Sequence, residues 1–456
     1  MNFFLPKPIA LMGLLAIVTG LLVMVRPESR PTDLTVWTFA PEHARMYRDR
    51  IDGRPSLVEQ YELLTGKRVD VRLLSANALD VRLLSLIHSN GRDVPDLVEI
   101  EIGSIGKYFR APMDRVGLLP LNGYLQQSGL LDQIVPWRLA PWTKNGVLFG
   151  VPHDVHPVSL VYRKDLFDEA GIDLASAKTW VEFHKMGLRF QRYWRDRGIS
   201  RRWAMELPQS SADILRMMLQ QRRIHPLGAG NSVHLDEAGV ARTVLFYAQL
   251  VAGPGKIGED ASAGEVGFAR DLARGELCSL LMPDWRVDYL REFAPELAGK
   301  MAMMPLPRFE ANDAPTATWG GTMMGIVKNS ADTKGAWELL RFLQFSPQAL
   351  EVRRRTSDIL PPLKGAWENS AYHRPDAYFG GQKIEELYVQ LAGQIPPSYS
   401  SPYAVLASAH LSAVLNRTVR EVEAGRTDGL EEKVRVWLSE AAGRLREQIR
   451  FGEFPS

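Results

Sequence analysis

The fold class follows from four stretches of sequence: LTVWTFA (34–40), SLVEQYELLTG (56–66), KRVDVRLL (67–74) and DLVEIEI (96–102). The first, third and fourth stretches are rich in apolar and β-branched residues, which favours strands. The second opens with a capping box at Ser56 and Glu59 and ends at Gly66, a residue suited to the left-handed position that closes a helix. A further helix is expected over residues 78–88. The order β-α-β-α-β with short links predicts a parallel sheet flanked by helices.

The same alternation continues beyond residue 148. A central strand is expected over 148–162, and Thr179 and Glu182 form a second capping box, which opens a helix that ends near Gly198. Further helices are expected over residues 211–221, 242–251, 333–345, 403–423 and 428–450, and short strands over 277–282 and 325–327. Two α/β lobes are the economical arrangement of these elements.

Composition places the chain among globular proteins. Its 456 residues are 45% hydrophobic and 24% charged, close to the averages for soluble domains. These values exclude a disordered chain, a collagen and a polytopic membrane protein. The net charge of +2 argues against a nucleic-acid partner, which usually needs a concentrated basic surface. The single cysteine, Cys278, excludes an intramolecular disulfide and a zinc site built from cysteines, and its apolar neighbours predict a buried thiol.

Residues 1–32 differ from the rest of the chain. Lys7 precedes a run without charge, IALMGLLAIVTGLLVMV (9–25), and Arg26 follows it. A basic start and an apolar core resemble a signal peptide, and the run lies at the lower limit for crossing a bilayer, which takes about 17–25 residues. No small-x-small cleavage site ends the run, and no nearby cysteine could hold a lipid. We expect an uncleaved signal anchor with an exported globular part; a cleaved signal peptide is the alternative.

Motifs for cofactors and metals are weak. Residues 253–256, Gly-Pro-Gly-Lys, lack the spacing of a phosphate-binding loop, and the chain has no complete dinucleotide-binding fingerprint. His153 and His156 have an HxxH spacing, but they follow a strand and lie between Pro152 and Pro157. Polar residues of a loop or hinge are therefore favoured over a zinc site, and no cofactor or metal is expected.

Glu99 and Glu101 stand two residues apart in an expected strand, so they project from the same face, about 6.5–7 Å apart along it. Paired carboxylates at such distances serve glycosidases, which makes a glycoside hydrolase or lyase that uses Glu99 and Glu101 one alternative. Glycosidase pairs normally come from different elements of the fold. The other interpretation is that the end of this strand meets solvent or a polar cleft.

Six of the 11 tryptophans fall into two groups. Three lie on expected helices and are predicted to pack in the core: Trp180, Trp337 and Trp437. Three others lie at strand ends or beside turn residues: Trp37, Trp285 and Trp319. Ligands of open α/β sheets bind at such strand ends, where aromatic faces can stack on pyranose rings and Asp154 and Asp284 can accept hydroxyl protons. This pattern favours a sugar-binding cleft.

Four blocks of the chain resemble one protein family. They are LTVWTFA with the helix and strand after it (34–74), DVPDLVEI (93–100), LFGVPHD (148–154) with LVYRKDLFDEAG (160–171) and Thr179-Trp180, and WGGTMMGIVKN (319–329) with the helix after it. The third block is the most specific, and it is similar to the family's run of G-V-P-x-D, Y-x-K-D-L-F-x-x-A-G and T-W. In this order the blocks resemble the extracellular solute-binding proteins of ABC importers, in the maltose-binding-like, sugar-binding group.

The resemblance implies a two-lobed α/β periplasmic binding protein of type II, the Venus-flytrap architecture, behind the N-terminal anchor. Lobe 1 would comprise residues 33–153 and 319–358, and lobe 2 residues 157–316 and 362–456. Such a protein is a monomer on the periplasmic side of the membrane that binds a carbohydrate between its lobes and delivers it to ABC permease subunits. Together with the residues above, the resemblance gives this candidate ligand-binding set: Trp37, Glu99, Glu101, Ser104, Asp154, His156, Asp284, Trp285, Trp319, Gly320, Gly321, Tyr399 and Tyr403.

Two features depart from the family pattern. Most members have a cleaved signal or a lipid-bearing cysteine, and this chain shows neither. Glu99 and Glu101 stand where many members have smaller or uncharged residues. A membrane-tethered sensor, which binds sugar and passes the signal to a receptor, is therefore a second alternative to import, beside the hydrolase.

Overall fold

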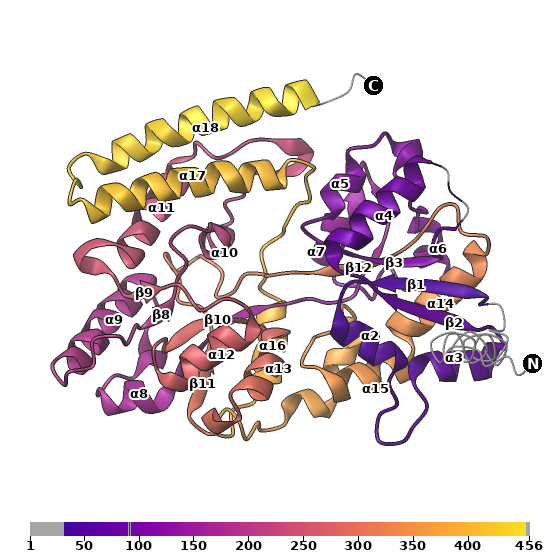
Figure 1. Ribbon diagram of the computed structural model, residues 1–456, viewed down its shortest axis with the longest axis horizontal. Coiled ribbons are helices and arrows are strands. Elements are labelled where there is room, and N and C mark those ends of the chain that lie inside the picture. Colours follow the sequence, from indigo (N-terminus) through magenta and orange to yellow (C-terminus); the bar gives the residue numbers. More distant parts are fainter. Residues whose placement is uncertain (1–31, 90, 92, 453–456) are drawn as a thin grey trace, which may run out of the picture.

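A mixed five-stranded sheet lies at the centre of lobe 1 (Figure 1). The strands run in the order β2-β1-β3-β12-β6, with the bounds Val69–Leu73, Leu34–Thr38, Leu97–Glu101, Thr322–Ile326 and Val151–Pro152. β1 pairs in parallel with β2 and β3, as the alternating pattern predicts. β12 runs antiparallel between β3 and β6, so a segment from far downstream completes the sheet.

The computed structural model describes residues 32–89, 91 and 93–452. The expected signal anchor, residues 9–25, lies outside the described residues. Within the described ranges, no helix is both long and apolar enough to cross a membrane.

Helices cover both faces of the lobe 1 sheet (Figure 1). Glu99 of β3 contacts His43 of α2 on one face, while Trp37 of β1 packs under Arg82 of α4 on the other. The main helices of this lobe are α2 (Pro41–Arg48), α3 (Leu57–Thr65), α4 (Ala76–His88), α14 (Thr333–Phe345) and α15 (Pro347–Thr356). The shorter elements are α5 (Ile105–Phe109), α6 (Asn122–Gln127), α7 (Pro136–Leu139), β4 (Thr143–Lys144) and β5 (Val147–Leu148).

Both predicted capping boxes are present. The Glu59 N–H donates to Ser56 Oγ at 3.1 Å, and the Ser56 N–H donates to Glu59 Oε2 at 2.8 Å. Helix α9 (Trp180–Arg195) opens in the same way, with the Glu182 N–H donating to Thr179 Oγ1 at 3.1 Å. These bonds satisfy amide groups that a helix start leaves without an internal partner, which is why the sequence signal marks the boundary so well.

Lobe 2 is built on a three-stranded antiparallel sheet, and the short strands at residues 205–206 and 258–259 pair with each other in parallel. The strand order is β10-β7-β11, with the bounds Ser279–Pro283, Val158–Arg163 and Met301–Met304. Figure 1 shows α17 and α18 side by side along one edge of the molecule, and both contact α11. The other elements of this lobe surround the sheet: α8 (Lys164–Glu169), β8 (Met205–Glu206), α10 (Asp213–Gln221), α11 (Ala238–Val251), β9 (Gly258–Glu259), α12 (Glu265–Arg274), α13 (Arg286–Phe293), α16 (Ile384–Ala392), α17 (Ala404–Glu423) and α18 (Leu430–Gly452).

Four side chains predicted to be buried are buried. Trp180 and Trp437 pack in lobe 2, and Trp337 packs in lobe 1. Cys278 is fully enclosed, and burial raises the pKa of its thiol to about 12. The thiol is therefore an inert part of the core, as predicted from its apolar neighbours.

The chain passes between the lobes at three crossings, residues 153–157, 318–321 and 357–361. The first two run antiparallel to each other, because Pro157 pairs with Thr318. The prediction of a single strand over residues 148–162 is wrong, because β5, β6 and β7 are separate strands. The prolines remove backbone donors that a continuous strand needs, and His156 turns the chain with a φ of 52°, in the left-handed region.

Candidate functional site

A hollow of about 460 Å³ opens between the lobes beside the second crossing. Lobe 1 contributes the turn after β3, at Ile102 and Gly103. Lobe 2 and the crossing contribute most of the polar and aromatic lining, which includes Asp213, Arg216, Gln220, His225, Thr318, Trp319, Ser398, Tyr399 and Ser400. Hydroxyl, amide and charged groups beside aromatic rings suit a ligand that has both apolar faces and many hydroxyl groups.

A second hollow of about 490 Å³ adjoins the first, because Asp213 and Trp319 line both. It lies on lobe 2, and its polar lining consists of Glu206, Ser211, Asp213, Asp260, Ser262 and Arg286. Arg286 Nη1 donates to Glu206 Oε2 at 3.1 Å, which holds both side chains in the wall. Each hollow falls within the range of about 300–1,000 Å³ that is typical of small-molecule sites.

Trp285 and Trp319 form an aromatic wall of the second hollow, and Trp319 also lines the first. Their ring centroids lie 6.0 Å apart with the planes at 77°, an edge-to-face contact. Trp285 Nε1 donates to the Trp319 backbone oxygen at 3.0 Å. Both side chains are half-buried, so part of each ring remains accessible. The hydrogen bond and the ring contact hold the two indoles in place before a ligand arrives.

Asp154, His156 and Asp284 form a buried chain of charges at the first crossing. His156 Nε2 lies 3.0 Å from Asp154 Oδ2, and His156 Nδ1 lies 2.5 Å from Asp284 Oδ1. Arg138 is also fully buried, and it donates to both the carboxylate and the backbone oxygen of Asp154. Burial lowers the pKa of His156, but the two carboxylates outweigh burial and raise this pKa to about 9. His156 is therefore a cation at neutral pH.

The two aspartates use their oxygens within the protein. Asp154 Oδ2 accepts from the Thr322 N–H at 2.8 Å, and Asp284 Oδ2 accepts from the Leu360 N–H at 2.9 Å. Asp284 thereby joins lobe 2 to the first and third crossings. Neither aspartate, nor His156, lines either hollow. Their contacts are those of residues that hold the crossings together.

Gly320 and Gly321 give the second crossing a conformation that favours glycine, with φ values of 88° and 147°. A Cβ atom on Gly321 would lie 2.1 Å from Arg138 Nη2. One on Gly320 would lie 3.3 Å from Trp285 Nε1. The absence of side chains at these two positions lets Arg138 and Trp285 pack against the crossing.

Four other predicted site residues lie in different surroundings. Trp37 is only 2% exposed and packs in the lobe 1 core, with the Arg82 guanidinium 4.9 Å from its ring centre. Ser104 and Tyr403 are also buried, and the Ser104 hydroxyl donates to Asp80 Oδ2 at 2.6 Å. Tyr399 is exposed, lines the first hollow and contacts the ring of His225 edge-to-face at 5.2 Å.

Glu99 and Glu101 have different environments. Glu99 is fully buried and accepts hydrogen bonds from Thr38, His43 and Tyr47. Glu101 is half-buried beside Ile102 and Gly103, and burial raises the pKa of its carboxyl despite a hydrogen bond from the Gly103 backbone. The two glutamates therefore do not form a carboxylate pair in the cleft, which removes the geometry that the hydrolase alternative needs.

Five residues of the cleft and crossings were not predicted: Arg138, Glu206, Asp213, Arg216 and Arg286. Asp213 and Arg216 lie in the first half of the helix expected over residues 211–221, but the sequence does not reveal that this part of the helix faces the other lobe. Arg286 directly follows Asp284 and Trp285, so its position beside predicted site residues was a usable signal. Arg138 has no local motif, and only the tertiary fold places it under the crossings.

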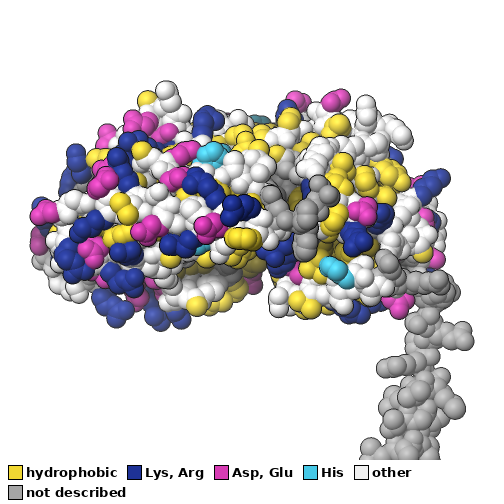
Figure 2. Space-filling view, turned by 90° about the horizontal axis from the view of Figure 1, so that it is seen from above, with side chains coloured by type: hydrophobic (Ala, Val, Ile, Leu, Met, Phe, Trp, Pro, Cys, Tyr) yellow, Lys and Arg dark blue, Asp and Glu magenta, His cyan; other side chains and the backbone are white. Residues whose placement is uncertain are grey.

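Charges on the surface are mixed. Figure 2 shows acidic and basic side chains interspersed over the face seen from above, in keeping with the net charge of +2. On the described part of that face, no patch of one sign dominates.

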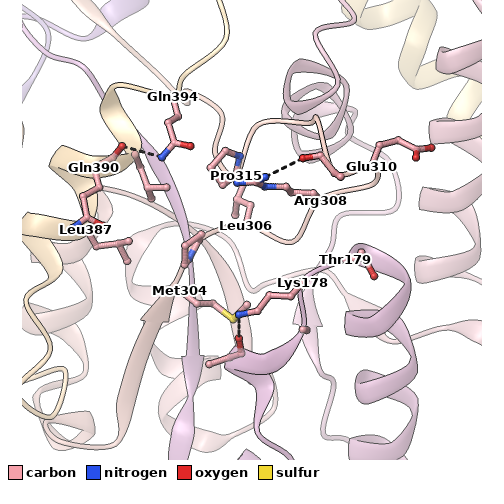
Figure 3. Close-up of a pocket in the computed structure, with 15 residues that line it drawn as sticks. Lys178, Thr179, Met304, Leu306, Arg308, Glu310, Pro315, Leu387, Gln390 and Gln394 are labelled. Atoms are coloured by element: carbon pink, nitrogen blue, oxygen red, sulfur yellow. Dashed lines mark hydrogen bonds between the residues drawn. The ribbon is translucent and has the colours of Figure 1, made fainter.

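Figure 3 shows a different hollow, of about 570 Å³, in lobe 2. Lys178 Nζ donates to the Ala175 backbone oxygen at 3.2 Å, and Arg308 Nη1 donates to the Ala311 backbone oxygen at 3.1 Å, so both cations have protein partners. Among the described residues that line this hollow, none belongs to the predicted ligand-binding set. It is therefore separate from the cleft.

Two α/β lobes joined by three crossings, with hollows beside the crossings, define a binding protein of the periplasmic type. The sequence matches the profile of the bacterial extracellular solute-binding proteins over residues 55–349. This match spans more than half of the chain, and the chain belongs to this family.

Named relatives and a solved structure agree with this assignment. The arabinooligosaccharide-binding protein of Halalkalibacterium halodurans is 24% identical over 398 residues, which cover 86% of this chain and 85% of the relative. That of Bacillus subtilis is 25% identical over 391 residues, with 82% and 84% covered. The ABC transporter associated binding protein of B. animalis subsp. lactis, solved with β-1,6-galactobiose, superposes with a TM-score of 0.68 at 20% identity and covers 92% of this chain and 98% of its own. The predicted two-lobed fold is confirmed.

Proposed function

We propose that this chain is an extracytoplasmic solute-binding protein that captures an oligosaccharide between its lobes and delivers it to the permease of an ABC importer. Its family supports the binding role, and the relatives named for arabinooligosaccharides support the ligand class. The observation that carries the proposal is the pair of accessible tryptophans, Trp285 and Trp319, on the wall of two adjoining hollows.

The lining matches the two surfaces of a sugar ring. The apolar C–H faces can pack on Trp285 and Trp319, as in other aromatic contacts with a desolvated partner. The hydroxyl groups can bind the carboxylates and hydroxyls of the second hollow, among them Asp213 and Ser262. Because Trp319 lines both hollows, a ligand of more than one ring can occupy both, whereas a monosaccharide fills only one.

The ligand is enclosed by rotation of the lobes, residues 33–153 with 319–358 and residues 157–316 with 362–456, about the three crossings. A ligand shifts this equilibrium only if it binds the closed state better. A ligand that touches both Gly103 of lobe 1 and Tyr399 of lobe 2 binds the closed state better, because it makes both contacts at once when the lobes approach.

The chain works as a monomer on the periplasmic side of the membrane, held there by residues 9–25. It releases its ligand unchanged, since Glu99 is enclosed by Thr38, His43 and Tyr47 and does not reach the cleft.

The test is calorimetric titration of the purified full-length chain with arabino- and galacto-oligosaccharides of two to four units, and with the matching monosaccharides. We expect at least one oligosaccharide to bind more tightly than the matching monosaccharide. When this oligosaccharide is present at 100 times its dissociation constant, it is expected to raise the free energy of unfolding of the protein by about 2.7 kcal/mol. Chromatography after overnight incubation is expected to recover the intact sugar. No binding of any oligosaccharide, or release of shorter products, would overturn the proposal.

A further inference from the structure

The HxxH motif of the first crossing divides between two clusters. His156 belongs to the ion pairs with Asp154 and Asp284. His153 is 1% exposed, and neither of its ring nitrogens has a hydrogen-bond partner among the described residues. Buried polar groups are normally paired, because removing them from water without a partner costs free energy. The bare nitrogens of His153 therefore need an explanation that the sugar cleft does not supply.

His153 lies against two other side chains that bind metals in proteins. Its ring stacks on His43 of α2, with the centroids 3.7 Å apart and the planes at 23°. His43 Nδ1 in turn lies 2.9 Å from Glu99 Oε2 of β3. One ligand-type atom from each of the three side chains lies within 4.8 Å of the other two, and all three residues are buried.

We propose that His43, Glu99 and His153 form a binding site for a divalent transition metal ion of the zinc type. Two imidazoles and one carboxylate are a common zinc ligand set, and imidazole nitrogens also suit copper and nickel. Ligand atoms around a tetrahedral zinc ion lie about 3.3 Å apart, at Zn–N distances of about 2.0–2.1 Å, so these side chains have to approach by about 1.5 Å or less. Within the described part of the chain, no hydrogen bond restrains the ring of His153, which allows it to turn toward the ion.

Neighbouring groups already hold the carboxylate in position. The Thr38 hydroxyl donates to Glu99 Oε2, and the Tyr47 hydroxyl donates to Glu99 Oε1 at 2.6 Å. The Tyr47 oxygen accepts from Gln344 Nε2 at 3.1 Å. Hydrogen bonds of this kind orient metal-binding side chains, and their loss typically weakens metal affinity about 10–100-fold.

Arg353 opposes a metal ion in this cluster. Its guanidinium is fully buried and donates to the backbone oxygen of His153 and to Gln344 Oε1. Removing this positive charge should tighten metal binding, an effect that a purely structural polar cluster would not produce. A bound ion would join α2, β3 and the residue that follows β6, which makes its role structural, at the point where the first crossing leaves lobe 1.

The test uses the full-length chain after treatment with a chelator, titrated with Co²⁺ and then with Zn²⁺. We expect one equivalent of Co²⁺ to give the visible absorption of a four-coordinate ion, and Zn²⁺ to displace it. His153→Gln and Glu99→Gln are each expected to weaken Zn²⁺ binding by at least about 100-fold, since they remove a ligand rather than a supporting bond. Arg353→Gln is expected to strengthen it.

His410→Gln is the matched control, because His410 is half-buried on α17, far along the chain from the cluster, and its ring bonds to the exposed side chain of Gln448. Glu99→Gln keeps the size of the side chain, so it remains informative if His153→Gln does not fold, and circular dichroism without metal checks each fold. The proposal is overturned if the wild type binds neither ion, if both ligand variants bind as tightly as the wild type, or if His410→Gln loses the ion. None of these results bears on sugar binding, which is measured separately.

Discussion

His156 Nδ1 lies 2.5 Å from Asp284 Oδ1, and this ion pair joins the first crossing to the end of β10 in lobe 2. Both side chains are almost completely buried. Asp284 also accepts the backbone N–H of Leu360 in the third crossing, while His156 reaches back to Asp154. Two crossings are thus held against lobe 2 by one carboxylate.

Asp284→Asn is expected to lower the free energy of unfolding by about 3–5 kcal/mol, because it leaves the buried charge of His156 without one of its partners. Denaturation in urea, followed by fluorescence, measures the change. Glu431→Gln is the control, since Glu431 forms an exposed pair with Arg435 at 2.6 Å, and such pairs contribute about 0–1 kcal/mol. A similar small effect in both variants would contradict the importance of the buried pair.

The stability of the protein is expected to fall in alkaline solution through His156. Its pKa is raised to about 9 in the folded protein, against about 6.5 for an unperturbed histidine. The resulting stabilisation is complete below pH ~6.5 and is lost as the pH rises through ~9, a change of about 3 kcal/mol. The charged groups that face His156 are Asp154, Asp284 and, through Asp154, Arg138.

Urea denaturation of the wild type and of His156→Gln, each at pH 6, 8 and 10, checks this pH dependence. At pH 6 the wild type should have the larger free energy of unfolding. The difference from His156→Gln should shrink toward pH 10, because only the wild type loses a proton from residue 156. If the free energies of unfolding of the two proteins differ by the same amount at all three pH values, His156 does not titrate in this range.

Local signals account for most of what could be predicted about the fold. A capping box acts within one helical turn, so Ser56 and Thr179 mark helix starts wherever the rest of the chain lies. The insertion of β12 between β3 and β6 leaves no local pattern, because pairing between distant segments depends on the whole fold. Helix α2 was missed although Pro41 at its first position and Glu42 in its first turn are recognised start signals.

The site was harder to predict than the fold, as three tryptophans illustrate. Trp37, Trp285 and Trp319 all lie at strand ends or beside turns, so their local sequence does not distinguish a buried ring from one that lines a cleft. In the structure α4 covers Trp37, while Trp285 and Trp319 line the hollows. The difference arises from which element packs over each ring, and that is a tertiary property. Missing α2 likewise hid His43 and Tyr47, the partners that enclose Glu99.

Gly321→Ala is expected to destabilise the protein, because its Cβ would lie 2.1 Å from Arg138 Nη2 and its φ of 147° is strained for any other residue. Such a backbone conformation usually costs a residue other than glycine about 1–3 kcal/mol of stability. Displacement of Arg138 would add to this loss. Gly443→Ala in α18 should have the opposite sign, since its Cβ meets nothing within 4 Å and alanine favours a helix interior by about 0.5–1 kcal/mol. Thermal unfolding of both variants measures the contrast, and a destabilised Gly443→Ala would contradict the reasoning.

Trp285→Ala and Trp319→Ala are expected to weaken oligosaccharide binding while leaving the fold intact. Aromatic stacking on a nucleic acid base is worth about 1–3 kcal/mol, and a contact with a sugar face near the lower end of this range gives an expected loss of about 5-fold for each variant. Trp319→Ala should have the larger effect on longer sugars, because Trp319 lines both hollows and Trp285 only one.

Trp437→Phe is the control: Trp437 is buried in lobe 2 under Arg417, so its replacement should lower stability without changing affinity. Calorimetric titration with the best-binding sugar separates these outcomes, and unchanged affinity in both alanine variants would show that the sugar does not contact this wall.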